Sequence, residues 1–136
     1  MKNILVIEDD PLYFRKIKNA LDDGKEFKVF PENRKNSVEL ISKMSSEDFN
    51  WIDETYKKID IYLVDNRINS ALIGMKYLEF KNINNSDAIF ILISSAPINQ
   101  SQFENLNLKK DHLFRSSLGI ASIIQYIKKS IENLSN

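Results

Sequence analysis

Three consecutive acidic residues near the amino terminus are the first whose types and spacing could do chemistry. Glu8, Asp9 and Asp10 follow the apolar run 4–7, which is typical of a short strand buried on both faces. Acids placed there lie at the carboxyl end of the strand, where open α/β sheets bind ligands. Carboxylates this close repel one another, and a hard cation such as Mg²⁺ relieves the repulsion through oxygen ligands. The alternative is an acidic turn that caps a helix beginning at Pro11.

Three later apolar runs, 61–64, 89–93 and 113–114, are each followed by a polar residue in the same way. Because the carboxyl ends of parallel strands meet at one edge of a sheet, we expect these residues to converge with the first acids. Three carboxylates, one hydroxyl and one cation suit a site for a metal ion and a phosphoryl group. The converging residues are Glu8, Asp9, Asp65, Ser94 and Arg115.

Roles follow from the chemistry of each side chain. Asp65 stands alone at its strand end and is the natural nucleophile for an acyl phosphate, while Glu8 and Asp9 hold Mg²⁺. Ser94 can donate a hydrogen bond to a phosphoryl oxygen, and Arg115 can pair with a carboxylate at rest and with phosphate after transfer. Each residue alone has an ordinary interpretation as a turn, a cap or a surface ion pair. Their joint occurrence in this order favours the functional interpretation.

The elements that must position these residues are strands alternating with helices. Such a pattern predicts a parallel sheet covered by helices on both faces. The last helix is the clearest, because apolar residues recur every three or four positions from 120 to 134. The five predicted strands lie at 4–7, 27–30, 59–64, 88–93 and 113–114.

The first helix is predicted to begin near Pro11 and to end at Gly24, a residue suited to a left-handed C-terminal position. Its apolar face carries Phe14, Ile17 and Leu21. Such spacing places the three side chains on the core side of the helix.

The long segment 37–58 exceeds what one crossover helix needs, and the run SSED at 45–48 resembles a fresh N-cap. One extended helix and two separate helices both remain open. Trp51 and Tyr56 in its second half either cover the core or form a partner-binding patch. The polar segment 97–110 is predicted to be the least stable helix or partly irregular.

Composition narrows the class of protein. The chain has 136 residues, 43% of them hydrophobic, which predicts a single domain spanning 1–136. Lys+Arg and Asp+Glu both number 19 and are scattered, so direct binding of nucleic acid is not expected. The chain has no cysteine and one histidine, His112, which rules out a metal cluster built on those residues. The lack of a secretory or membrane-spanning segment predicts a cytoplasmic protein with no membrane partner.

Motifs spread over nearly the whole chain resemble those of a response-regulator receiver domain. They are ILVIEDDP at 4–11, LVD at 63–65, GMKYL at 74–78, ILIS at 91–94 and the terminal amphipathic helix. The resemblance implies a flavodoxin-like (βα)5 three-layer sandwich with a five-stranded parallel sheet of order 2-1-3-4-5.

The resemblance also implies roles for single residues. Asp65 is the phosphoacceptor, Ser94 is the switch hydroxyl with Ser95 as the competing assignment, and His112 occupies the aromatic switch position. The implied ligands of Mg²⁺ are Glu8, Asp9, Asp65 and the backbone carbonyl of Arg67. The implied partners are a sensor histidine kinase or phosphotransfer protein and a downstream protein effector. A homodimer through the helix 4-strand 5-helix 5 face is a further implied possibility.

Three departures from the family pattern stand out. Arg115-Ser116 replaces the usual Lys-Pro, and without the proline we expect a trans peptide bond there. Ile68-Asn69 stands where a Met-Pro pair is common, which predicts a looser loop. His112 either adds pH sensitivity or simply packs at the sheet edge.

Two functions therefore compete. The first is a stand-alone receiver in phosphorelay signalling, which accepts a phosphoryl group on Asp65 and switches partner binding. The second is a pseudo-receiver, a protein-interaction module that works without phosphorylation. A hydrolytic enzyme is disfavoured because aspartyl-nucleophile phosphatases carry a second Asp where this chain has Arg67. We therefore expect no catalysis beyond the protein's own phosphotransfer and dephosphorylation.

Overall fold

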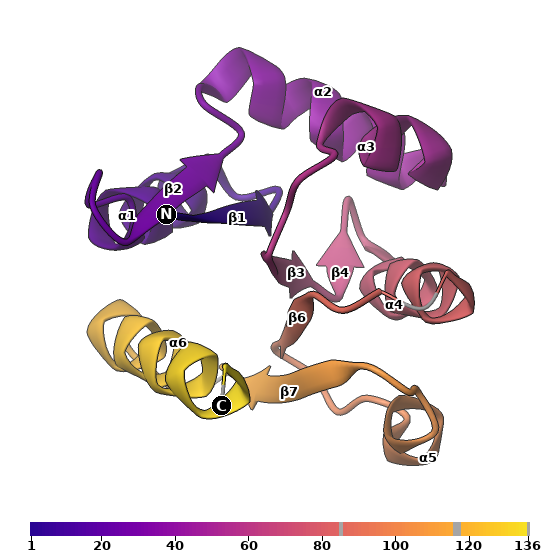
Figure 1. Ribbon diagram of the computed structural model, residues 1–136. Helices are drawn as coiled ribbons and strands as arrows, with labels where there is room; N and C mark the ends of the chain where they lie inside the picture. The colour runs from indigo at the N-terminus through magenta and orange to yellow at the C-terminus, as the bar shows by residue number, and fades with distance from the viewer. Residues whose placement is uncertain (85, 116–117, 136) are drawn as a thin grey trace.

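The computed structural model describes residues 1–84, 86–115 and 118–135 (Figure 1). The predicted trans peptide between Arg115 and Ser116 lies outside this range. In chain order the elements are β1 (Lys2–Ile7), α1 (Pro11–Leu21), β2 (Phe27–Phe30), α2 (Arg34–Ser45), α3 (Phe49–Thr55), β3 (Ile61–Asp65), β4 (Arg67–Ile68), β5 (Ala71–Leu72), α4 (Gly74–Ile83), β6 (Ile89–Ser94), α5 (Gln100–Glu104), β7 (Lys109–Phe114) and α6 (Ile120–Leu134).

The main sheet has five parallel strands in the order β2-β1-β3-β6-β7. Counting only these five strands along the chain, the order is 2-1-3-4-5, which confirms the predicted flavodoxin-like fold. The central strand β3 is buried along its whole length. Its register pairs Val64 with Ile7 on one side and with Leu92 on the other. The ends of the central strands are therefore level with one another.

Alternate residues of each central strand enter two separate cores. In β1, Ile4 and Val6 pack with the inner faces of α1 and α6, while Leu5 and Ile7 pack with helices on the opposite face. This period of two follows from the alternation of side chains along a strand. Figure 1 shows α1 and α6 on one side of the sheet and α3, α4 and α5 on the other. The result is the predicted three-layer arrangement.

Helix α1 buries Phe14, Ile17 and Leu21 as predicted, but it ends at Leu21 rather than at Gly24. Asp22 ends it because its backbone N–H still bonds to the carbonyl of Lys18 while its side chain turns to accept from the N–H of Val29. Gly24 lies in the following turn with a φ of 68°, so the left-handed conformation was predicted correctly but the helix end was not.

The long segment after β2 forms two helices, α2 and α3. Asp48 begins the second helix by accepting a hydrogen bond from the N–H of Trp51 at 3.3 Å. Trp51 and Tyr56 are partly buried against the core, which favours the packing interpretation. The polar segment 97–110 contains the five-residue helix α5 and the first two residues of β7, and its other residues are irregular, as one of the two predictions stated.

Strand β7 extends over Lys109–Phe114, well before the predicted start at residue 113. Its first residues are polar, and the alternation of apolar side chains is weak there. The strand lies at the edge of the sheet, where polar side chains are tolerated because one side faces solvent. This explains why the apolar pattern predicted only its last two residues.

The connection after β3 is more ordered than predicted. Strands β4 and β5 pair in antiparallel fashion around Asn69 and Ser70, whose φ angles are 48° and 69°. Two consecutive left-handed residues are the signature of a tight two-residue hairpin, and Asn suits such a position. The expected looser loop is therefore wrong. Across the residues described, no helix has the length and apolar character needed to span a membrane.

Candidate functional site

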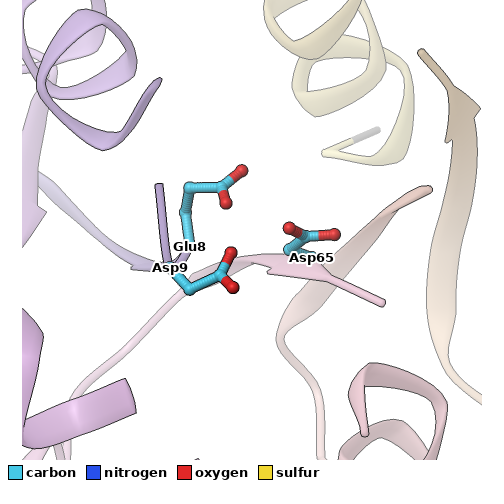
Figure 2. A group of neighbouring side chains, drawn as sticks. All are labelled: Glu8, Asp9 and Asp65. Atoms are coloured by element: carbon cyan, nitrogen blue, oxygen red, sulfur yellow. The ribbon is translucent and has the colours of Figure 1, made fainter. Parts of the chain in front are cut away.

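The acids at the ends of β1 and β3 point toward one another at the carboxyl edge of the sheet (Figure 2). Glu8, Asp9 and Asp65 each offer a carboxylate oxygen within 4.8 Å of the others. The register that pairs Ile7 with Val64 makes this meeting unavoidable, because the next residue of each strand is an acid. Glu8 is 3% exposed and Asp65 is 4% exposed. The predicted convergence of these three residues is observed.

The third acid of the triplet has a structural task. The Asp10 carboxylate accepts hydrogen bonds from the backbone N–H of Leu12 at 3.0 Å and of Tyr13 at 3.2 Å. These bonds satisfy amide groups that the first turn of α1 leaves without helical partners. The Asp10 N–H in turn donates to Glu8 Oε2 at 3.2 Å. The N-cap therefore fixes both the start of α1 and the direction of the Glu8 side chain.

Arg115 lies over the acids as a built-in cation. Its Nη1 is 2.8 Å from Glu8 Oε1, and its Nη2 is 3.5 Å from Asp65 Oδ2. The backbone N–H of Arg115 donates to the carbonyl of Ser94 at 2.8 Å, which continues the sheet into the site. The structure thus brings Arg115 to the predicted edge, with its shorter contact on Glu8 rather than on the predicted phosphoacceptor.

The backbone after Asp65 is held by its neighbours. The Asn66 N–H donates to the carbonyl of Ile93 at 2.8 Å, and the Asn66 side chain accepts from the N–H of Met75 at 3.0 Å. The carbonyl of Asn66 also accepts from the Gly74 N–H at 3.0 Å. These bonds connect the end of β3 to β6 and to the start of α4, so Asp65 projects from a fixed backbone.

Ser94 and Ser95 face different surroundings. The Ser94 side chain is buried, and its Oγ lies 2.6 Å from Nε2 of His112 on the neighbouring strand β7. Ser95 is exposed and lines a cavity of about 400 Å³ together with Asp65 and Arg115. Both serines therefore remain candidates for contacting a phosphoryl group, and only Ser94 is tied to His112.

The side chain of His112 on β7 is partly buried. Its ring lies 6.0 Å from that of Phe103 of α5 and hydrogen-bonds with Ser94. Burial lowers the pKa of His112, which favours the neutral imidazole. The residue predicted at the switch position thus contacts the predicted switch hydroxyl directly.

The hairpin tip joins the acid edge to α2. The Asn69 N–H donates to Asp9 Oδ2 at 2.9 Å, and the Asn69 side-chain amide donates to Ser45 Oγ at 2.8 Å. Asp65 Oδ1 accepts from the N–H of Arg67 at 3.2 Å. The backbone carbonyl of Arg67, the remaining ligand implied by the receiver resemblance, belongs to the same short hairpin and stays a prediction.

Burial raises the pKa of Glu8 to about 8, and the nearby charge of Asp65 adds to the rise. Burial also raises the pKa of Asp65, while contact with Glu8 and the charge of Arg115 act in the opposite direction. Removing a carboxylate from water disfavours its charged form, and a second carboxylate beside it does the same. In the absence of a further cation, this pair of acids therefore favours holding a proton near neutral pH.

A pH dependence of stability follows for the metal-free protein. Glu8 binds its proton more tightly when folded than when unfolded, where its pKa is about 4.3. Stability from this group is fully present below that value and is lost as pH rises toward 8, by at most about 1.4 kcal/mol per pH unit. Urea unfolding in EDTA between pH 6.5 and 8.5 measures the loss.

Glu8→Gln is the control for that experiment, because it removes the titrating group without changing side-chain size. The slope between pH 6.5 and 8 should then flatten. His112, whose pKa is lowered from its ordinary value of about 6.5, makes stability rise slightly with pH at the lower end of this range, in the wild type and in Glu8→Gln alike. An equal slope in the wild type and in Glu8→Gln would contradict the assignment to Glu8.

The donor set fits a hard divalent cation. All three clustered side chains offer carboxylate oxygens, which Mg²⁺ prefers, and their oxygens are close enough for one ion to contact each of them. Two of the three acids are buried, so their mutual repulsion is poorly screened by water. The chemistry of the acids themselves therefore supports Mg²⁺ binding here.

Two contributors to the site were not predicted from the sequence. Tyr13 stacks against the guanidinium of Arg115, with 4.5 Å between its ring centre and Cζ. Asn69 is expected from the sequence to be only a loop residue, yet it contacts Asp9 directly. The position of Tyr13 three residues after the capping Asp10, in the first helical turn, could have indicated that its ring lies near the acids.

The five-stranded parallel sheet with helices on both faces is a fold that this chain shares with several solved receiver domains of response regulators. No family model matches the sequence, and no curated protein matches it either.

Three of the similar structures come from different organisms. The phosphorylated cyanobacterial phytochrome response regulator RcpA aligns with a TM-score of 0.66 and 16% identity, covering 99% of this chain and 94% of its own. The response regulator domain of Thermotoga maritima CheB gives 0.65 and 12%, covering 100% and 98%. A CheY-like receiver domain protein from Methanospirillum hungatei gives 0.63 and 16%, covering 99% and 97%. At identities this low, the structural similarity establishes a shared fold only.

Proposed function

We propose that this protein is a response-regulator receiver in phosphorelay signalling that accepts a phosphoryl group on Asp65 in the presence of Mg²⁺. The observation that carries the proposal is the position of Asp65 at the end of the central strand, within reach of two further acids and one guanidinium. One of the similar structures is a phosphorylated response regulator, which supports the same chemistry on this fold.

The chain's own residues would divide the work. An oxygen of Asp65 attacks the phosphorus of a phosphohistidine, the P–N bond breaks, and the imidazole leaves with a proton from solvent. Arg115 can follow the new negative charge, because its Nη2 already lies 3.5 Å from Asp65 Oδ2. Bound Mg²⁺ would supply positive charge to the phosphoryl oxygens. Glu8 and Asp9 would hold that ion, with the carbonyl of Arg67 as the remaining protein ligand.

The switch would run through Ser94 and His112. In the tautomer in which Nε2 of His112 accepts from Ser94 across 2.6 Å, the hydroxyl must release this bond before it can donate to a phosphoryl oxygen. His112 packs on Phe103 of α5, so release of this bond alters the contact between β7 and α5. The surface formed by α5, β7 and α6 is therefore the proposed region in which affinity for an effector, or for a second copy of the chain, changes.

The direct test is labelling of Asp65 by a small phosphodonor. Incubation with phosphoramidate and MgCl2 should add one phosphoryl group to the wild type, detected by intact-mass spectrometry, and none to Asp65→Asn. Asp87→Asn is the matched control, because Asp87 is exposed and lies away from the acid cluster. Labelling of the wild type that persists in Asp65→Asn would contradict the assigned phosphoacceptor.

The alternative function is a pseudo-receiver, a protein-interaction module that works without phosphorylation. The observation that favours it is the ion pair between Arg115 and Glu8, which already neutralises one acid of the cluster at 2.8 Å. Failure of the wild type to accept a phosphoryl group, together with unchanged partner binding in Asp65→Asn, would establish this second function.

A further inference from the structure

The contact between Tyr13 and Arg115 bears on how the acid site accepts a cation. Glu8 uses both of its oxygens within the protein, because Oε1 accepts from Arg115 at 2.8 Å and Oε2 accepts from the Asp10 N–H at 3.2 Å. Each oxygen keeps a second lone pair, but a divalent ion bound at Oε1 would lie beside the guanidinium of Arg115, whose like charge repels it. The guanidinium contact is the one that a side-chain movement can release without unwinding the start of α1.

Arg115 is held at Glu8 from two sides. Its backbone N–H is fixed on the carbonyl of Ser94, and its guanidinium stacks on the face of Tyr13 at 4.5 Å. An arginine over an aromatic ring gains both electrostatic and packing energy, and more when it is sheltered from water. The Arg115 side chain is 19% exposed, so this shelter is substantial. The ring therefore favours the position in which the guanidinium reaches Glu8.

The Tyr13 ring is itself well placed before any cation arrives. Tyr13 lies in the first turn of α1, its N–H bonds to the Asp10 carboxylate, and its ring packs against the core shared by α1 and α6. The geometry points to Tyr13 as a positioning residue that holds Arg115 on Glu8, so that the guanidinium and a divalent cation compete for the same carboxylate. The choice of Mg²⁺ as that cation rests on the proposed function, whereas the competition depends only on the acid cluster.

The test is the affinity of the purified protein for MgCl2 alone, measured by isothermal titration calorimetry at pH 7.5 and 0.15 M NaCl. Arg115→Gln should bind Mg²⁺ about tenfold more tightly than the wild type, because Glu8 loses its charge-assisted hydrogen bond with the guanidinium and is free to bind the ion. Tyr13→Leu should bind about threefold more tightly, as expected from the energy of one cation–π contact. Tyr13→Phe keeps an aromatic face and should stay within about twofold of the wild type.

A control variant separates competition at Glu8 from the long-range electrostatic effect of removing any positive charge. Arg15→Gln removes one positive charge from α1, in a cavity that Glu8 and Asp9 also line, and Arg15 joins none of the ion pairs found among the described residues. At this salt concentration its effect on affinity should stay within about twofold. Equal gains in Arg15→Gln and Arg115→Gln, or no gain in Tyr13→Leu, would overturn the inference.

Separate measurements distinguish misfolding of a variant, failure of the competition and failure of the proposed receiver function. Thermal unfolding of each variant without metal shows that it is folded, and Tyr13→Leu replaces a partly buried ring with an apolar side chain that such a site accepts. Tighter Mg²⁺ binding in both variants without phosphodonor labelling would support the competition and reject the receiver function. Phosphodonor labelling of the wild type, together with Mg²⁺ affinities that do not change in the variants, would support the receiver function and reject the competition. If no variant binds Mg²⁺, the competition is overturned.

Discussion

Gly74→Ala should destabilise the protein and disturb the acid site at the same time. A Cβ on Gly74 would lie 2.6 Å from the carbonyl oxygen of Asp65 and 2.6 Å from Cα of Asn66. Both obstacles are backbone atoms, so no side chain can rotate away. Overpacking of this kind costs about 1 to 3 kcal/mol, and the displaced atoms belong to Asp65, the proposed phosphoacceptor, and to its neighbour Asn66.

Urea unfolding and Mg²⁺ titration measure the two effects of Gly74→Ala together. The free energy of unfolding should fall by at least about 1 kcal/mol, and Mg²⁺ affinity should fall with it because the end of β3 shifts. Gly119→Ala is the matched control, since a Cβ at that position would meet nothing within 4 Å and the φ of Gly119 is −74°. Gly119 is the N-cap of α6, where alanine is less favourable than glycine, but alanine also loses less backbone entropy on folding. Because these two effects oppose each other, the change in the free energy of unfolding should stay below about 1 kcal/mol. Wild-type stability in Gly74→Ala would show that the close approach is not required.

Asp53→Ala should produce the second large loss of stability, far from the site. The Asp53 carboxylate of α3 accepts from Lys81 Nζ at 3.0 Å and from the Tyr77 hydroxyl at 2.9 Å. The Lys81 side chain is only 10% exposed and Tyr77 is fully buried, so removing the acid leaves an ammonium and a hydroxyl without this partner. We expect the free energy of unfolding to fall by about 3 kcal/mol.

The double variant Asp53→Ala, Lys81→Met tests the stated cause. Removing the orphaned charge as well should restore at least about 1 kcal/mol, because an unpaired buried charge costs more than an apolar replacement. Lys76→Ala is the control, since its ion pair with Glu47 is about half exposed on both sides and should change stability by less than about 1 kcal/mol. No recovery in the double variant would mean that Asp53 acts through packing alone.

The strand ends were predictable because a short apolar run and a parallel sheet leave little freedom. Glu8, Asp65 and Ser94 follow runs that are buried along their length, so their place at the carboxyl edge depended only on the sheet being parallel. The acidic turn before α1 and the run 45–48 before α3 were also recognisable as helix starts, because capping is a local interaction between neighbouring residues. These features needed no knowledge of distant contacts.

The contacts of Arg115 and the hairpin at Asn69 could not be predicted, because they depend on packing between distant residues or on a weak turn signal. Arg115 was placed at the edge correctly, yet its preference for Glu8 and its stacking on Tyr13 join residues about a hundred positions apart. A long side chain can reach several partners, and packing in the folded state selects among them. The hairpin around Asn69 was missed because Asn-Ser is a weaker signal for a tight turn than Asn-Gly.

The two left-handed residues at the hairpin tip fix the length of the connection between the acid edge and α2. A two-residue turn of this handedness matches the natural twist of its strands, and a longer or opposite-handed turn would splay them. Asn69 contacts both Asp9 and Ser45 from that tip, so the spacing between the first strand's acids and α2 is set by backbone chirality. The length of the hairpin thus sets the distance between the acids and α2. Insertions within it would change the dimensions of the acid site even with every acidic residue kept.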